Sequence, residues 1–314
     1  MQRRNAWPAR RVRRARGRKV GSAEGATVKD IRVESWQELN ERLYEGAWNP
    51  ALERFRSNWA FRGVGNAAYD LTTSLARLGP DAGRLEGHLL RNFRKYAPRD
   101  GAMGDSVWNW LALAQHHGLP TRLLDWTYSP FVAMHFATQD LESYDQDGVI
   151  WCMDYVRANG LLPGELRALL EEEGANAFTG EMLDLSACSL AELDALAAKA
   201  FVLFLEPPSL DQRIVNQYAL FSLMSSPSAH LHAWLAERPK LFRRIVIPAE
   251  LKWEVRDKLD QANITERVLF PGLDGLSRWL RRHYMPRREV ERGAVVDDGV
   301  SAVPARAVRG RRAG

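Results

Sequence analysis

Cysteine is scarce in this chain of 314 residues, which contains only Cys152 and Cys188. Two thiols are too few for a disulfide framework or a cysteine-based zinc site, and such scarcity is typical of a reducing compartment. Long apolar runs are also missing, since no segment reaches the roughly 18–20 residues that cross a bilayer. The N-terminus lacks the apolar core of a secretory signal. We therefore expect a soluble, cytoplasmic protein with no membrane segment.

Several motifs that would assign a chemistry directly are absent as well. The sequence has no Gly-x-Gly-x-x-Gly and no Gly-x-x-x-x-Gly-Lys-[Ser/Thr], so a doubly wound dinucleotide fold and P-loop phosphate chemistry are unsupported. It has no Gly-x-Ser-x-Gly elbow. The adjacent His116 and His117 would point about 100° apart on a helix, and no His-x-x-x-His pair occurs. We expect no metal site.

Positive charge is concentrated at the two ends. The chain has a net charge of +5 and a pI near 9.3, yet without its terminal arginines it is slightly acidic. Residues 1–27 are Arg-rich, and both they and residues 286–314 are expected to be disordered. Two interpretations of the N-terminal tail remain open. It could contact nucleic acid weakly or an acidic partner, or it could be translated from a start codon upstream of the true one.

The hydrophobic pattern predicts one α+β domain over residues 28–285. Because strands and helices do not alternate in a regular βαβ rhythm, a mixed or antiparallel sheet with packed helices is favoured. Residues 161–200 are rich in Leu, Ala and Glu and predict two helices forming a surface insertion or lid. Strands are expected at 31–33, 59–63, 148–153, 201–205 and 242–247, and helices at 36–43, 83–96, 107–116, 130–137, after 248 and through 279.

Polar residues crowd the sequence around a Gly–Pro break at residues 118–120. Arg122 and Asp125, three residues apart, are expected to form a scaffolding ion pair, although Asp125 or Thr127 could instead orient a ligand hydroxyl or a nucleophile. Upstream, the always-charged guanidinium of Arg62 suits a phosphate or carboxylate, with a structural ion pair as the alternative. Gly63 would let a ligand or a neighbouring backbone come close.

These segments together resemble the FRG domain, a bacterial and phage family named for its Phe-Arg-Gly tripeptide. The resemblance rests above all on the long run from Gln115 to Thr127 and on Phe61-Arg62-Gly63. Further support comes from Leu71…Ser74-Leu75-Ala76-Arg77, Ser129-Pro130…Ala133…Phe136-Ala137, Arg213…Gln217…Phe221 and residues 269–276. The resemblance covers about residues 28–285.

The layout of this family is in turn similar in outline to ADP-ribosyltransferases. That resemblance implies that Arg62 and Gly63 meet the phosphates of NAD, and that Trp126 or Tyr128 packs on nicotinamide. Asp125, Thr127 and Gln217 would line the ribose side, where a polar group stabilises an oxocarbenium-like centre. Those enzymes usually rely on a late glutamate, which Gln217 is not. Glu206 is a candidate substitute.

Two functions from different classes follow. The first is a nucleotide-binding, ADP-ribosyltransferase-like protein that uses NAD and modifies an unknown protein or nucleic acid, in phage defence or as a toxin. Its expected catalytic residues are Gln217, Asp125 and His117, and its ligand-binding residues are Arg62, Gly63, Arg122, Trp126 and Thr127. The second is a recognition module without chemistry, which would bind a nucleotide, a protein or a phage component at the same place.

Overall fold

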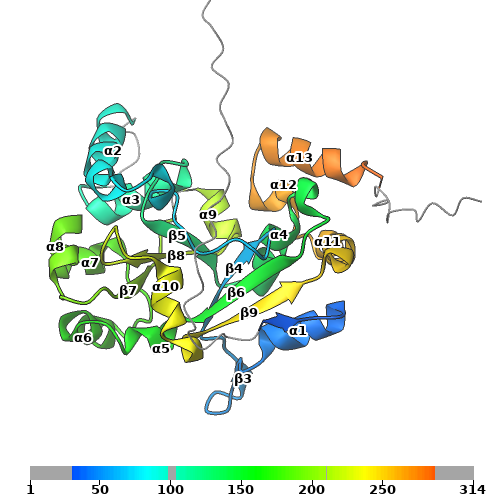
Figure 1. Cartoon of the computed structure of the whole chain (residues 1–314), viewed down its shortest axis with the longest axis horizontal. Coiled ribbons are helices and arrows are strands. Elements are labelled where there is room, and N and C mark those ends of the chain that lie inside the picture. The colour runs from blue at the N-terminus through cyan, green and yellow to red at the C-terminus, as the bar shows by residue number, and fades with distance from the viewer. Residues whose placement is uncertain (1–29, 98–103, 210, 287–314) are drawn as a thin grey trace, which may run out of the picture.

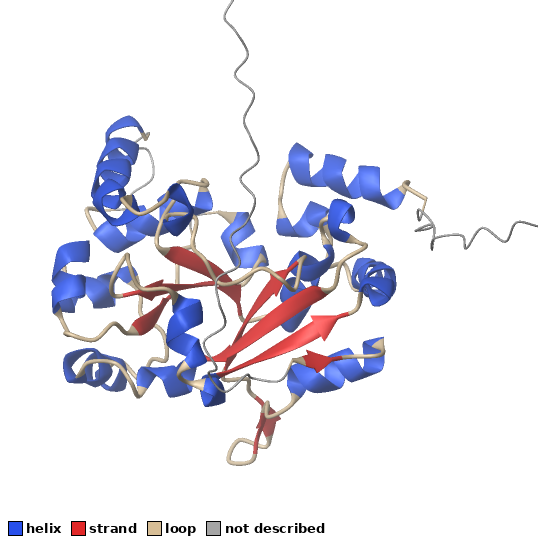
Figure 2. Cartoon of the chain, viewed as in Figure 1, coloured by secondary structure: helices blue, strands red, loops and turns tan. Residues whose placement is uncertain are grey.

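The computed structural model describes residues 30–97, 104–209 and 211–286. Of the terminal segments expected to be disordered, residues 1–27 and 287–314 lie outside the described residues. A seven-stranded sheet runs through the described part (Figure 2). Its strands lie in the order β1 (Ile31–Arg32), β9 (Phe242–Ile247), β6 (Gly148–Asp154), β4 (Trp59–Val64), β5 (Leu123–Thr127), β8 (Ala219–Met224) and β7 (Val202–Leu205).

The sheet is mixed, as predicted. Neighbouring strands are antiparallel except β1 and β9, which run parallel. A separate hairpin pairs β2 (Trp48–Asn49) with β3 (Arg54–Phe55). With the helices that pack against the sheet, this confirms the α+β fold class.

Helices cover one face of the sheet in two groups, each with its own hydrophobic core. The first group packs over β4, β6 and β9 around Phe61, Ile150 and Ile245. It consists of α1 (Trp36–Tyr44), α4 (Pro130–Thr138) and α11 (Lys252–Gln261). The second packs over β5, β8 and β7 around Leu123 and Leu223. It consists of α2 (Ala82–Tyr96), α3 (Val107–His116), α6 (Gly164–Glu172), α7 (Gly180–Ser186) and α8 (Leu190–Ala195).

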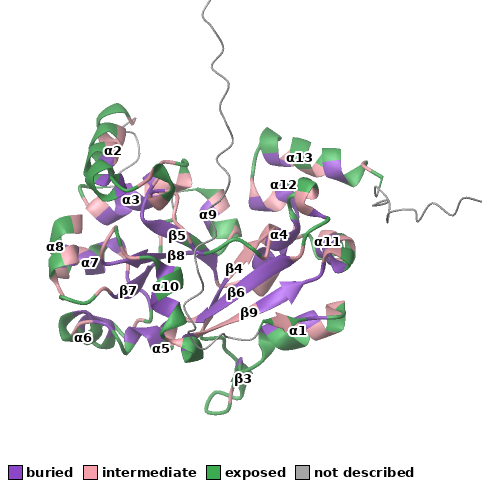
Figure 3. Ribbon diagram, in the orientation of Figure 1, coloured by how far each residue is buried: buried purple, intermediate pink, exposed green. Residues whose placement is uncertain are grey.

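The opposite face of the sheet has a third core built around Trp126, Trp151 and Phe204. The helices α5 (Tyr155–Asn159) and α10 (Leu231–Ala236) cover it. Figure 3 shows that the strands between these layers are mostly buried. The remaining helices, which lie near the end of the sheet beside α4 in Figure 1, are α9 (Gln212–Asn216), α12 (Glu266–Leu269) and α13 (Leu273–His283).

Residues 161–200 form three helices, α6, α7 and α8, where two were expected. Several of their leucines, among them Leu166 and Leu183, are fully buried in the core over β5, β8 and β7, whereas Leu161 and Leu185 are exposed. The segment is therefore part of the structural core of the domain, because its leucines cover strands that would otherwise be exposed.

Local sequence signals position the helix ends near the FRG segment. Ser129 caps α4 by accepting a hydrogen bond from the amide of Val132, with Pro130 at the first helical position. The helix α3 ends where Gly118 adopts a φ of 82°. There the amide of Leu119 donates to the carbonyl of Ala114, at 2.9 Å, which is the pattern of a glycine-terminated helix. The chain can then turn from α3 into β5.

Candidate functional site

The sheet splits between β4 and β5. Strand β4 pairs with β6 along its whole length, but with β5 it pairs only between Phe61 and Thr127. Arg62 follows this last pair, and its guanidinium reaches across to β5. Its Nη1 donates to the main-chain oxygen of Asp125, at 2.6 Å, and lies 3.7 Å from the Asp125 carboxylate. The split therefore places an arginine between two diverging strands.

The Arg62 side chain is partly buried, with 23% of its surface exposed. Its Nε is buried without a hydrogen-bond partner among the described residues. Burial lowers the pKa of Arg62, the carboxylate of Asp125 opposes that shift, and the nearby Arg77 adds to it. Since an arginine stays charged in proteins, the group is a cation with unused donor capacity.

Asp125 is held by a chain of polar side chains. The amide nitrogen of Gln115 donates to both carboxylate oxygens of Asp125, at 3.1 Å each. The Gln115 oxygen accepts from the Thr121 hydroxyl at 2.6 Å, and the Thr121 amide donates to the Ser74 hydroxyl at 3.2 Å. These contacts fix the Asp125 carboxylate while leaving the side chain 60% exposed. It is available to a ligand from solvent.

Gly63 serves the packing of strand against helix. A Cβ at this position would lie 1.8 Å from the Ala133 carbonyl oxygen and 2.7 Å from the Ala137 amide nitrogen. Both atoms belong to the backbone of α4. Of the two possibilities left open by the sequence, the structure shows the close approach of a neighbouring backbone.

The expected ion pair between Arg122 and Asp125 does not form. Arg122 is 4% exposed and binds both carboxylate oxygens of Glu86, with its Nη2 2.6 Å from one of them. It also contacts Asp194 on α8. Its partners lie 36 and 72 residues away in the sequence, where local spacing could not reveal them. With its guanidinium committed to these carboxylates, Arg122 has little capacity left for a ligand.

Trp126 and Thr127 are both buried, at 3% exposure each. The Trp126 indole donates to the Ser222 hydroxyl at 2.8 Å and packs on Phe204 within the core. The Thr127 hydroxyl donates to the main-chain oxygen of Gln217 at 2.7 Å. The structure thus brings Thr127 next to Gln217, whereas Trp126 belongs to the core.

Gln217 lies between α9 and β8, and its side-chain amide donates to the Leu269 carbonyl, at 2.9 Å.

His117, at the end of α3, is exposed and meets the ring of His116 edge-on. Of the two histidines, His116 is the one that contacts a carboxylate: its Nε2 lies 2.6 Å from the Asp211 side chain. Burial lowers the pKa of His116, and Asp211 opposes that shift.

A cluster of tyrosines follows Thr127. The Tyr128 hydroxyl donates to the Glu206 carboxylate at 2.6 Å. The Tyr128 ring lies 5.7 Å from that of Tyr155 and 5.1 Å from that of Tyr218. Sequence reasoning singled out Glu206 and Tyr128 separately but missed Tyr155, Tyr218 and Asp211, because nothing in their local sequence marks them.

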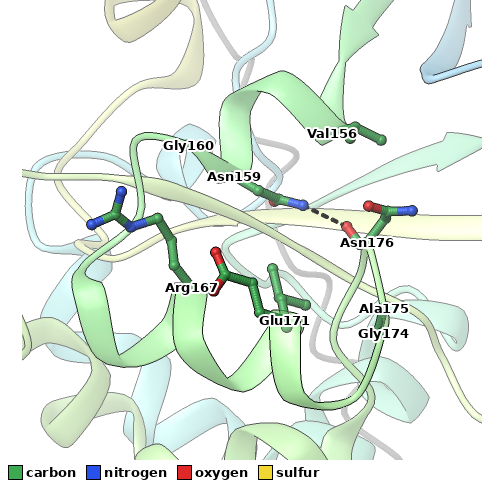
Figure 4. A pocket seen from close by; sticks show the side chains of 9 residues that line it. Val156, Asn159, Gly160, Arg167, Glu171, Gly174, Ala175 and Asn176 are labelled. Atoms are coloured by element: carbon green, nitrogen blue, oxygen red, sulfur yellow. Dashed lines mark hydrogen bonds between the residues drawn. The ribbon is translucent and has the colours of Figure 1, made fainter.

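A groove of about 440 Å³ lies elsewhere (Figure 4). It is bounded by the end of α5, by Arg167 and Glu171 on α6, and by the loop at residues 174–176. In it the Asn159 amide donates to the Asn176 carbonyl at 2.8 Å. None of the residues of the split lines this groove. Polar groups converge at the split, which we therefore take as the candidate site.

Among the described residues, no group of three or more His, Cys, Asp or Glu side chains could hold a metal ion. Likewise, none of the helices in the described part of the chain is both long and apolar enough to span a membrane.

Comparison with known proteins addresses the family. No curated protein and no solved structure matches the chain. Residues 57–146 match the model of the family described as the FRG domain. The matched segment includes β4, the α3–β5 turn and α4, and so contains Arg62, Gly63 and Asp125. The chain carries an FRG domain, matched over residues 57–146.

Proposed function

We propose that the FRG domain binds a nucleotide at the split between β4 and β5, with NAD as the ligand and ADP-ribosyltransferase-like chemistry as the outcome. The observation that carries this proposal is the position of Arg62. Its guanidinium lies where the two strands diverge, spends Nη1 on a main-chain oxygen beside the Asp125 carboxylate, and makes no other hydrogen bond among the described residues. An arginine in such a place suits the planar oxygens of a pyrophosphate.

The surroundings of Thr127 suit the ribose side. Thr127 and Gln217 are joined by a hydrogen bond, and the exposed Asp125 carboxylate can accept from a hydroxyl. Trp126 is buried, so Tyr128 is the ring that could stack on nicotinamide. In the reaction the bond between the ribose C1′ and nicotinamide breaks, and nicotinamide leaves with the bonding electron pair. A nucleophile of the acceptor then bonds to C1′ and loses its proton to water.

One feature favours recognition without chemistry as the second candidate function. Gln217 carries an amide where a carboxylate would stabilise a developing positive charge, and that amide is already bound to the Leu269 carbonyl. The carboxylate of Glu206, the candidate substitute, is likewise engaged, since it accepts a hydrogen bond from the Tyr128 hydroxyl. Binding alone would use Arg62 and Asp125 equally well.

Incubation of the full chain with NAD, following nicotinamide release, separates these functions. The matched variants are Arg62→Ala and, as a control, Arg84→Ala, because Arg84 is exposed on α2. Release that is lost in Arg62→Ala and kept in Arg84→Ala supports the enzyme. Thermal stabilisation by NAD without release selects the recognition module. If NAD has neither effect on the folded protein, the proposal is wrong.

A further inference from the structure

An exposed aromatic surface with a carboxylate lies beside Thr127. Tyr218 is 60% exposed, and its ring meets that of the partly buried Tyr128 at 61°. Glu206 is also exposed, and accepts from the Tyr128 hydroxyl. Burial and the Glu206 charge both raise the pKa of Tyr128, so its hydroxyl stays protonated and keeps the carboxylate in place. The surface combines ring faces with a fixed negative charge.

This combination has no cation of its own. Within the described ranges, no Lys or Arg side chain lies over the ring of Tyr128, Tyr155 or Tyr218, and Glu206 makes no ion pair. Several other aromatic rings of the described residues have an arginine over them. Examples are Arg243 over Trp59, Arg244 over Trp151, Arg238 over Trp234 and Arg267 over Trp279, at 4.2–4.7 Å from the ring centres. The tyrosine surface is complementary to the same group.

The backbone of Tyr218 is strained. Its φ of 48° lies in the left-handed region, which is unfavourable for a bulky residue and is more often occupied by Gly, Asn or Asp. Despite the strain, the Tyr218 carbonyl accepts a hydrogen bond from the Tyr128 amide at 3.1 Å. Strain of this kind concentrates at functional positions. The ring is exposed, so packing in the core does not explain the choice of tyrosine.

We propose that Tyr218, Tyr128 and Glu206 bind the side chain of an arginine on a partner protein. The planar guanidinium stacks on the Tyr218 ring and donates to Glu206, a pairing that suits arginine better than lysine because its donors form a rigid fork. The inference does not depend on nucleotide binding. Arginine binding at this surface shares Tyr128 with the proposed nicotinamide contact, but it needs neither Arg62 nor a reaction.

The probe is N-acetyl-arginine methylamide, titrated into the full chain without nucleotide while the tyrosine ring signals are followed by NMR. The control ligand is the citrulline analogue, which has the same shape without the charge. We expect saturable shifts of the Tyr218 and Tyr128 signals with arginine, and binding of citrulline weaker by about fivefold or more, on the scale of a cation–π contact combined with an ion pair.

Three variants complete the test. Glu206→Gln and Tyr218→Asn should each weaken arginine binding by about threefold or more, whereas Glu173→Gln on the exposed end of α6 should leave it unchanged. Asn suits the left-handed backbone, so Tyr218→Asn should fold. Equal binding of citrulline, full binding by both site variants, or no movement of the Tyr signals would each overturn the proposal.

Discussion

Substitution of Gly63 by alanine tests the close packing of strand β4 against helix α4. The added Cβ would lie 1.8 Å from the carbonyl oxygen of Ala133, 2.8 Å from its carbonyl carbon and 2.7 Å from the amide nitrogen of Ala137. These are backbone atoms of a helix, so they cannot rotate out of the way as a side chain would. The helix must retreat from β4, and this opens the core around Phe61.

The expected cost is at the upper end of the range for overpacking. Such substitutions typically cost about 1–3 kcal/mol, occasionally more, and here we expect about 3 kcal/mol or above. At roughly 2–4 °C per kcal/mol for a domain of this size, the Tm should fall by about 6–12 °C. The measurement is the free energy of unfolding by denaturant, supported by a thermal scan.

Gly87→Ala is the matched control. Gly87 lies inside α2, and a Cβ there would meet nothing within 4 Å. Alanine should therefore stabilise the protein by about 0.5–1 kcal/mol, through its better helix propensity. The two glycines should respond with opposite sign. A Gly63→Ala protein as stable as the unsubstituted chain would refute the close approach of β4 and α4.

Three further outcomes follow from the buried polar groups and the strained backbone. Arg122→Ala should lower the unfolding free energy by about 3–5 kcal/mol, because it leaves Glu86 buried without its partner. The control Arg84→Ala should change the unfolding free energy by less than about 0.5 kcal/mol. Equal effects of the two substitutions would contradict the buried ion pair. His135, buried at 0% exposure, has its pKa lowered to about 3 by burial, with the charge of Arg256 adding to the shift. The unfolded state therefore binds the proton more tightly, and the unfolding free energy should fall as the pH drops below about 6.5, by up to about 1.4 kcal/mol per pH unit. In denaturant titrations between pH 6.5 and 5, His135→Gln should flatten this pH dependence. An unchanged slope in the His135→Gln protein would contradict the role of His135. Tyr218→Asn should raise the unfolding free energy by about 1 kcal/mol by relieving the left-handed φ, and a clear loss of stability would show that the tyrosine ring is needed for the fold.

Much of the fold near the site follows from short-range signals. The cap at Ser129, the proline after it and the glycine at 118 act within one turn of chain, so the ends of α3 and α4 could be predicted. The strand expected at residues 148–153 has no polar side, as suits the buried interior strand β6 that it forms in the sheet. These features depend on neighbours a few residues apart.

The side-chain partners could not be predicted in the same way. Arg122 has an acid three residues away, but it lies just before β5 and binds Glu86 on α2 and Asp194 on α8 instead of Asp125. Trp126 alternates with Asp125 along β5, so one is buried in the core while the other is exposed. In the sequence, Tyr218 is 90 residues and Tyr155 is 27 residues from Tyr128, and only the fold brings the three rings together.

The central claim is that Arg62, at the split between β4 and β5, anchors a nucleotide. Calorimetric titration of NAD into the full chain and into folded Arg62→Ala protein tests it most directly. We expect saturable binding by the unsubstituted chain and affinity at least about tenfold lower for Arg62→Ala, the loss of one charge-assisted contact of roughly 1.5–3 kcal/mol. Equal affinity of the two proteins, or no binding by either, would contradict the account.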